Sequence, residues 1–251
     1  MTSASGALAG CRCVALVGAG GKTSLAWTLM QHSLDAGQRA IYTTTTHTLL
    51  PADGAFDRVL VEPDAARAAR LLAEDRTWRS AWLAAAVVGG FEGEIHSAMP
   101  LTRVKAKGYA PDAVRALAAL DAVRIVEADG ALRRWIKAPA DHEPVLPPEL
   151  DAVIVVACLD ALGQPLDARI AHRPERVAEE TGLRLGERLT AAALVALLCS
   201  PGGGLKGVTG NVRRIAALSR LRAPRERDIE AALRAHGFDA VLDYPLVAAS
   251  M

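Results

Sequence analysis

Residues Gly18 to Thr23 read GAGGKT and combine three glycines with a lysine and a hydroxyl group. Several backbone N–H groups can converge on one anion where glycines permit unusual φ/ψ angles, and a following helix adds its dipole. Lys22 can then reach the β- and γ-phosphates, and the Thr23 hydroxyl can bind Mg²⁺. The predicted nucleotide-binding residues are Gly18, Ala19, Gly20, Gly21, Lys22, Thr23 and Ser24.

The loop matches only the second half of the GxxxxGK[ST] pattern, because Leu16 stands where that pattern has its first glycine. Its glycine-to-lysine spacing is similar to that of the GTNGKT loop of Mur ligases, which also lack the earlier glycine. The alternative interpretation is an ordinary glycine-rich turn with Lys22 in solvent. We favour phosphate binding, since the loop follows an apolar run and opens a helical segment.

Two acids follow a second apolar run, in the sequence VRIVEADG. Carboxylates at the tip of a neighbouring strand commonly assist Mg²⁺ bound to phosphates. Alternation along an extended chain puts Glu127 and Asp129 on one face. We predict that Asp129 joins Thr23 at the metal and that Glu127 acts as the base for water, with Lys22 stabilising the phosphoryl charge. The alternative is a pair of solvated acids before a turn at Gly130.

Other polar segments are candidates for substrate contacts. TTTTH ends a predicted strand and offers Thr45 and His47, although threonine is also a good strand former. In KAPADHEP, prolines stiffen the backbone around the polar residues. HRPE supplies an arginine that can clamp a phosphate or carboxylate. An exposed connector and structural capping are the respective alternatives. The substrate candidates are Thr45, His47, Lys137, His142, Glu143 and Arg173.

The elements that must position these groups alternate between short β-branched runs and helical segments. This pattern predicts an α/β fold with a doubly wound, mostly parallel sheet, similar to P-loop NTPases, in one domain over residues 1–251. The segment from Trp82 to Ala119 is ambiguous, and GFEGEIHSAMPLTRVKAKGYAP within it is typical of an irregular loop. The predicted strands are Val14–Val17, Arg39–Thr46, Arg58–Val61, Ala122–Val126, Ala152–Ala157, Ile215–Leu218 and Ala240–Asp243. The predicted helices are Ser24–Gly37, Asp64–Ala73, Thr190–Leu198 and Arg225–His236.

Composition narrows the class of protein. The net charge of +1 over 251 residues provides no global field for nucleic acid or a membrane surface. No apolar run approaches the roughly 18 residues that cross a bilayer, and the first residues lack the pattern of a secretory signal. Four cysteines form no disulfide framework in a chain of this size, which fits a reducing cytoplasm.

Taken together, VGAGGKTS, TTTTH, VEADGALRRWIKAPADHEPVLP, LDALGQPLD and HRPE resemble the YqeC family over approximately residues 14–176. The resemblance implies a P-loop fold and a part in maturing a selenium-dependent molybdenum hydroxylase. Partners would be that hydroxylase or the proteins that mature its cofactor. The resemblance implies that Lys22 and Thr23 bind the nucleotide and that Asp129 binds Mg²⁺. It also implies that an unidentified substrate is bound by Lys137, His142, Glu143 and Arg173.

Three hypotheses of function follow. The first is an Mg²⁺-dependent NTPase in hydroxylase maturation, the second a small-molecule kinase or Mur-like ligase, and the third a nucleotide-switched chaperone with little turnover of its own. Related chains tend to carry an asparagine, lysine and aspartate segment near the C-terminal quarter, where this chain has RRIAALSRLRAP. ATP and GTP therefore both stay open as the nucleotide.

Overall fold

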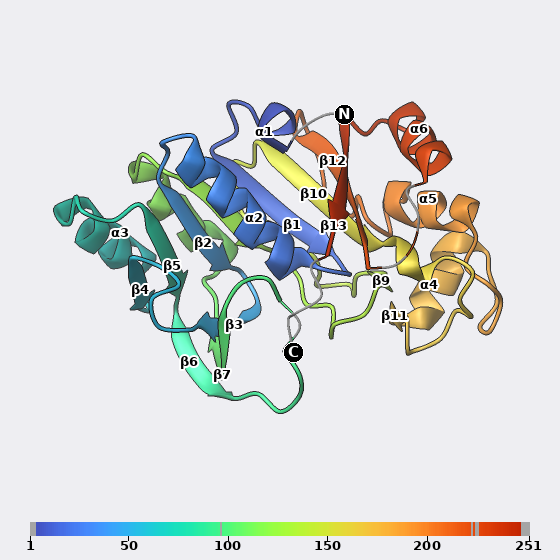
Figure 1. Ribbon diagram of the computed structural model, residues 1–251, viewed down its shortest axis with the longest axis horizontal. Coiled ribbons are helices and arrows are strands. Elements are labelled where there is room, and N and C mark those ends of the chain that lie inside the picture. Colours follow the sequence, from blue (N-terminus) through green and yellow to red (C-terminus); the bar gives the residue numbers. More distant parts are fainter. Residues whose placement is uncertain (1–3, 96, 222, 224–225, 247–251) are drawn as a thin grey trace.

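The computed structural model describes residues 4–95, 97–221, 223 and 226–246. Its centre is an eight-stranded sheet in the order β13-β12-β10-β1-β8-β2-β5-β4 (Figure 1). Every pair of neighbouring strands in this sheet is parallel. The strands are β1 Cys13–Gly18, β2 Ala40–Thr44, β4 Arg58–Val61, β5 Ser80–Ala84, β8 Val123–Glu127, β10 Ala152–Cys158, β12 Arg213–Arg220 and β13 Ala240–Pro245.

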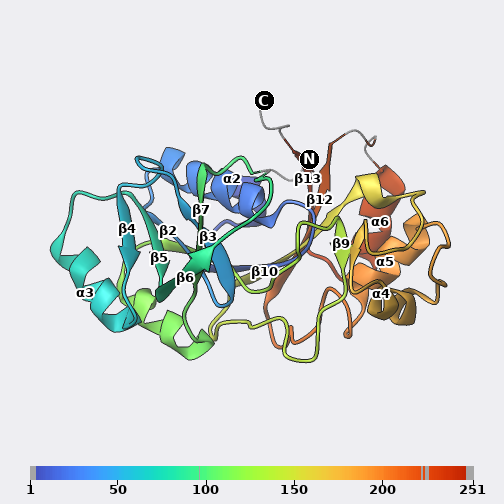
Figure 2. The same cartoon turned by 90° about the horizontal axis from the view of Figure 1, so that it is seen from below.

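Strands β1 and β10, at the centre of the sheet, are apolar along their whole length because both faces of the sheet are covered. Along β10, Val153 and Val155 pack with residues of helices α5 and α6, whereas Ile154 and Val156 pack with residues of helix α2. Figure 2 shows these helices on the two sides of the sheet. The prediction of a doubly wound α/β fold with a mostly parallel sheet is confirmed.

Two of the described helices begin at a residue whose side chain caps them. Asp64 accepts a hydrogen bond from the Ala66 N–H at the start of α3, and Thr190 accepts one from the Ala193 N–H at the start of α5. None of the described helices combines the length and apolar character needed to span a bilayer. The helices are α1 Ala4–Ala7, α2 Lys22–Asp35, α3 Ala65–Glu74, α4 Pro174–Thr181, α5 Ala191–Cys199 and α6 Arg227–Ala235, with 3₁₀ helices η1 Pro111–Ala119 and η2 Leu159–Ala161.

The order of the strands reverses at β1. Strands β2, β4, β5 and β8 lie to one side of β1, and the chain then crosses to β10, β12 and β13 on the other side. In open parallel sheets, ligands bind at the carboxyl ends of the strands next to such a reversal. The loop that follows β1 lies at this point, as do the residues after β8 and β10.

One prediction of irregular structure is wrong. Residues Leu101–Lys107 form β7, the middle strand of an antiparallel sheet with β3 His47–Pro51 and β6 Ala86–Gly90 (Figure 1). The segment alternates between exposed basic residues and smaller side chains, which is strand patterning. Its hydrogen-bond partners are far away in the sequence, so no local turn signal marks it.

A second parallel sheet and the helix that follows it were also not predicted. A two-stranded parallel sheet joins β9 Ile136–Lys137 to β11 Ala171–His172, and helix α4 follows β11 directly. The predicted helix at Arg225–His236 is observed as α6, which begins at Arg227, and Arg225 lies outside the described residues. Strand β12 extends further than the predicted Ile215–Leu218.

Candidate functional site

The loop after β1 has a backbone that only glycine adopts easily. Gly18, Gly20 and Gly21 have φ values of 92°, 86° and 114°. A Cβ atom on Gly18 would lie 2.3 Å from the Val156 carbonyl oxygen of β10. The Ala19 N–H donates to that same oxygen at 2.9 Å. The loop is therefore pressed against β10, and a side chain would displace it.

The backbone N–H groups of residues 20–24 form a candidate site for a ligand. Among the described residues, none of these five N–H groups has a hydrogen-bond acceptor. A helix always leaves its first N–H groups without partners inside the helix. Here the glycine loop places Gly20 and Gly21 directly before them, and the dipole of α2 favours negative charge at the same place. This is a concavity of donors suited to an anion.

Lys22 is buried at the start of α2 and folds back over the loop. Its Nζ donates to the Gly18 carbonyl at 2.6 Å and lies 3.0 Å from Asp129 Oδ1, an ion pair without hydrogen-bond geometry. The Gly18 N–H donates to Asp129 Oδ2 at 2.9 Å. Asp129 thus braces both the loop and its lysine. The alternative of a solvated lysine is wrong, since only 6% of Lys22 is exposed.

Glu127 occupies the end of β8 and is also buried, so the alternative of two solvated acids is wrong as well. Burial raises the pKa of Glu127, and Lys22 and the hydroxyls of Thr23 and Tyr42 partly offset that rise. Its Oε1 has no hydrogen-bond partner among the described residues. A buried carboxylate oxygen without a partner, facing the Thr23 hydroxyl, provides the hard oxygen donors that Mg²⁺ prefers.

Four residues beyond the loop form a chain of buried ion pairs, which we call the ion ladder: Asp129, Lys137, Glu143 and Arg173. Lys137 Nζ lies 3.0 Å from Asp129 Oδ2 and 2.9 Å from Glu143 Oε2. Arg173 Nη1 donates to the same Glu143 oxygen at 2.8 Å. Burial alone would raise the pKa of Glu143, but Lys137 and Arg173 lower it to about 2. The ladder links the phosphate loop to the start of α4.

The remaining predicted site residues lie outside this network. The Thr45 hydroxyl donates to the Val145 carbonyl at 2.6 Å, and the Ser24 hydroxyl accepts from the Ala98 N–H at 3.0 Å. These bonds anchor loops beside the site. His47 is exposed on β3 opposite Lys107, and His142 is exposed in the loop before Glu143. Neither histidine belongs to the ion ladder.

Several neighbours of the site were not predicted. The Trp135 carbonyl and Cys158 pack against Gly20, because a Cβ there would lie 2.7 Å from each. Burial raises the pKa of Cys158 to about 11, so its thiol stays protonated at neutral pH. The Ser219 hydroxyl donates to the Gly20 carbonyl from β12. Sequence spacing held no signal for these contacts, which depend on the pairing of β10 with β1 and β12.

His172 precedes Arg173 in HRPE, a segment that the sequence predicts to lie where ligands bind. It lies in register with Lys137 across the β9–β11 pair. Burial, together with the positive charges of Arg173 and Lys137, lowers its pKa to about 4. Its position next to Arg173 in HRPE is the one signal that the sequence held.

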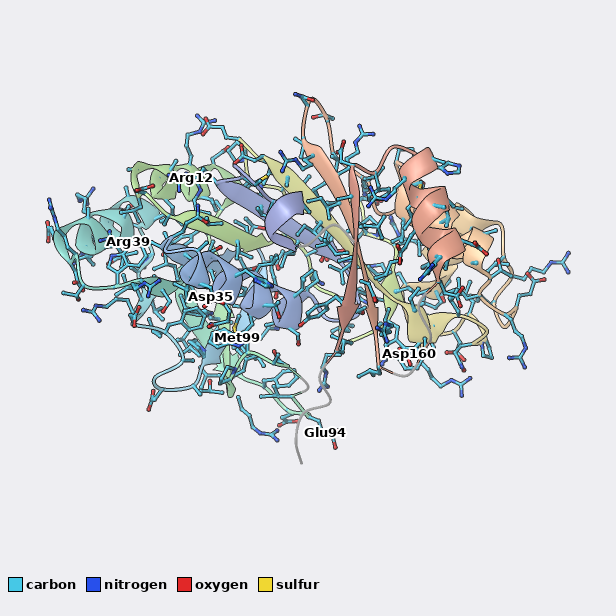
Figure 3. All side chains as sticks on the ribbon, turned by 45° about the horizontal axis from the view of Figure 1, so that its top comes forward. Arg12, Asp35, Arg39, Glu94, Met99 and Asp160 are labelled. Atoms are coloured by element: carbon cyan, nitrogen blue, oxygen red, sulfur yellow. The ribbon has the colours of Figure 1, made fainter. Side chains whose placement is uncertain are left out.

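The segments that flank the phosphate loop can be followed in Figure 3, which labels Met99 and Asp160. Met99 adjoins Ala98, whose N–H binds Ser24. Asp160 follows β10 and accepts hydrogen bonds from the Leu221 N–H at 2.6 Å and the Ala223 N–H at 3.3 Å after β12. Among the described residues, no three His, Cys, Asp or Glu side chains gather as a metal site of their own. A cation here would depend on a bound phosphate for further ligands.

Comparison with known proteins gives one family. A model of the YqeC protein family matches residues 14–175, a span that includes the phosphate loop and the whole ion ladder. The uncharacterized protein YqeC of Escherichia coli (strain K12) is 29% identical over 234 residues, which cover 91% of this chain and 85% of that protein. No solved structure matches.

Proposed function

The chain belongs to the YqeC family, and we propose that it is an Mg²⁺-dependent nucleoside-triphosphate-binding protein that hydrolyses its nucleotide in the cytoplasm. The observation that carries this proposal is the run of unpaired N–H groups at residues 20–24, with the buried Lys22 beside it. Backbone N–H groups of this kind can donate hydrogen bonds to the oxygens of a bound phosphate chain. A buried ammonium near them supplies the charge that phosphoryl transfer needs.

In this proposal Lys22 exchanges its internal partners for the nucleotide. The Gly18 carbonyl now accepts a hydrogen bond from the ammonium and Asp129 forms an ion pair with it, as phosphate oxygens would. Asp129 keeps its bond from the Gly18 N–H and its ion pair with Lys137, so its charge stays compensated when Lys22 turns to the phosphates. The loop is thus held open by the same carboxylate before and after binding.

Mg²⁺ fits best between Thr23 and Glu127. Asp129, the acid predicted as metal ligand from the sequence, has two ammonium groups at 3.0 Å, which would repel a dication. Glu127 faces hydroxyls and has an oxygen without a partner. When bound, Mg²⁺ would neutralise charge on the phosphate oxygens. We therefore assign Asp129 to holding the two lysines, and Glu127 with Thr23 to the metal.

The biological role that we propose is maturation of a molybdenum hydroxylase, of the selenium-dependent kind. It is supported by the resemblance of the chain to YqeC proteins over the motifs that form the site. The hydroxylase or the proteins that mature its cofactor would be the partners, and ATP and GTP are both candidate nucleotides. Transfer of the phosphoryl group to a small molecule is the second candidate function, favoured by the partly exposed Arg173 at the far end of the ladder.

Calorimetry with Mg-ATP and Mg-GTP tests the proposal. Wild-type protein should bind at least one of them, and binding should vanish in Lys22→Ala and weaken in Thr23→Ala with loss of its dependence on Mg²⁺. Lys105→Ala, which removes an exposed lysine on β7, is the matched control and should bind like the wild type. Circular dichroism of each variant checks the fold. Folded wild-type protein that binds neither nucleotide would overturn the proposal.

The same preparation separates the candidate functions. Steady phosphate release without any partner indicates an NTPase, and nucleoside-diphosphate release only with an added acceptor indicates a kinase or ligase. Tight nucleotide binding with negligible turnover until a hydroxylase is added indicates a nucleotide-switched chaperone.

A further inference from the structure

Arg173 lies close to the phosphate loop through the small β9–β11 sheet. The Trp135 carbonyl, directly before β9, touches Gly20 of the loop. That carbonyl also accepts from the Cys158 N–H at 2.9 Å, which fixes β9 to the end of β10. Arg173 follows β11, the strand that pairs with β9. The β9–β11 pair and the ion ladder therefore connect Arg173 to the phosphate loop.

The guanidinium of Arg173 is held by one nitrogen and is otherwise available. Nη1 donates to Glu143 at 2.8 Å and to the Ala138 carbonyl at 3.3 Å. Nε and Nη2 have no hydrogen-bond partner among the described residues, and a quarter of the side chain is exposed. These two nitrogens form the edge of arginine that binds a carboxylate or phosphate through parallel hydrogen bonds. Glu143 therefore acts as a positioning residue.

The backbone at Arg173 is held in an unusual conformation. Its φ of 63° is left-handed, a conformation that is strained for a residue with a side chain. The residue is also the N-cap of α4, yet its side chain does not bond to the helix. The side chain bonds to Glu143 instead, and the N-terminal end of α4 adds positive potential beside it.

Charge along the network leaves this end positive. Glu143 is shared by Lys137 and Arg173, so its single charge does not match both cations at this end of the ladder. The Lys137 side chain is 1% exposed and fully engaged, and cannot serve a ligand.

We infer that Arg173 forms a subsite for an oxyanion group of the second substrate, a carboxylate or a phosphate, beside the nucleotide. The inference rests on the proposed function and names the class of its acceptor: an acid, rather than a neutral alcohol, sugar or amine. No residue of the phosphate loop takes part in this subsite.

Two probes test the subsite, with the protein saturated by Mg-ADP so that the phosphate loop is filled. Inorganic phosphate and malonate are titrated separately, and the ¹⁵N-labelled arginine Nε–H signals are followed by NMR. The Arg173 signal, identified by its absence in Arg173→Lys, should shift with one probe or both, and their relative affinities tell a phosphate acid from a carboxylic one. Arg173→Gln should weaken probe binding about tenfold or more.

Arg169→Gln, an exposed arginine paired with Asp167 four residues before the subsite, is the matched control and should bind both probes like the wild type. Wild-type binding that Arg173→Gln leaves intact, or no shift with either probe, overturns the subsite. The two probes are also titrated into Lys22→Ala without nucleotide, so that the test of the subsite does not depend on nucleotide binding. A wild-type protein that does not bind Mg-ADP would contradict the proposed function, whereas the Arg173 signal reports on the subsite alone.

Discussion

The phosphate loop and the ion ladder are neighbours that work by different means. The loop is a contiguous stretch defined by glycine conformations and by backbone N–H groups without acceptors among the described residues. The ladder assembles side chains from the segment after β8, from β9, from the loop after β9 and from the start of α4, and depends on charge. Asp129 belongs to both. The loop should therefore fail when its shape changes, and the ladder when its charges lose their partners.

The largest effect is expected where the two regions meet. Asp129→Ala would leave the ammonium groups of Lys22 and Lys137 buried without their shared carboxylate. Breaking a buried ion pair from one side typically costs about 3–5 kcal/mol in the free energy of unfolding. Urea denaturation measures this loss, and Asp121→Ala, on an exposed pair with Arg12, should change little. A loss below about 1 kcal/mol would show that Asp129 does not hold the two regions together.

A change of shape in the loop should come next. Gly20→Ala puts a methyl group 2.7 Å from the Trp135 carbonyl and from Cys158 at a φ of 86°, so the loop must move. We expect a loss of about 1–3 kcal/mol in stability and of most nucleotide affinity. Gly163→Ala is the matched control, with a φ of 73° but open space around it. Similar results for the two variants would mean that backbone strain, and not the contact with β9 and β10, explains the effect.

A double-mutant cycle on Lys137→Met and Glu143→Gln measures the ladder itself. Their atoms lie 2.9 Å apart in a buried setting, so a coupling energy of about 0.5–3 kcal/mol is expected. The same cycle on the partly exposed pair of Arg58 and Asp75 should give a smaller value, about 0.2–1 kcal/mol. Equal couplings from urea denaturation would contradict the claim that burial distinguishes the ladder.

The smallest effect is a dependence on pH. The folded-state pKa of Glu143 is about 2, against 4.5 for an unperturbed glutamate, so the charged form stabilises the fold above about pH 4.5. That contribution is lost as the pH falls toward 2. The stability difference between wild type and Glu143→Gln should therefore narrow between pH 5 and pH 3 in denaturation experiments. A difference that stays constant over this range would mean that the Glu143 charge does not stabilise the fold.

The sequence determined the local parts of this protein. GAGGKT between an apolar strand and a helix predicts the phosphate loop, because the glycines, Lys22 and Thr23 act within one turn of chain. The alternation of β-branched runs and helices predicts the parallel sheet. The acids at the end of β8 are also visible, since a strand and its tip are contiguous.

Tertiary structure decided which partners these residues meet. That Asp129 holds two lysines, that Glu127 faces Thr23, and that His172 lies beside Lys137 all follow from pairings between distant strands. The strand Leu101–Lys107 exists because β3 and β6 complete its hydrogen bonds. Local patterns encode the propensity of a segment and the chemistry of its side chains. The energy of a buried charge depends on the partner that the fold brings to it, and that partner has no fixed distance along the chain.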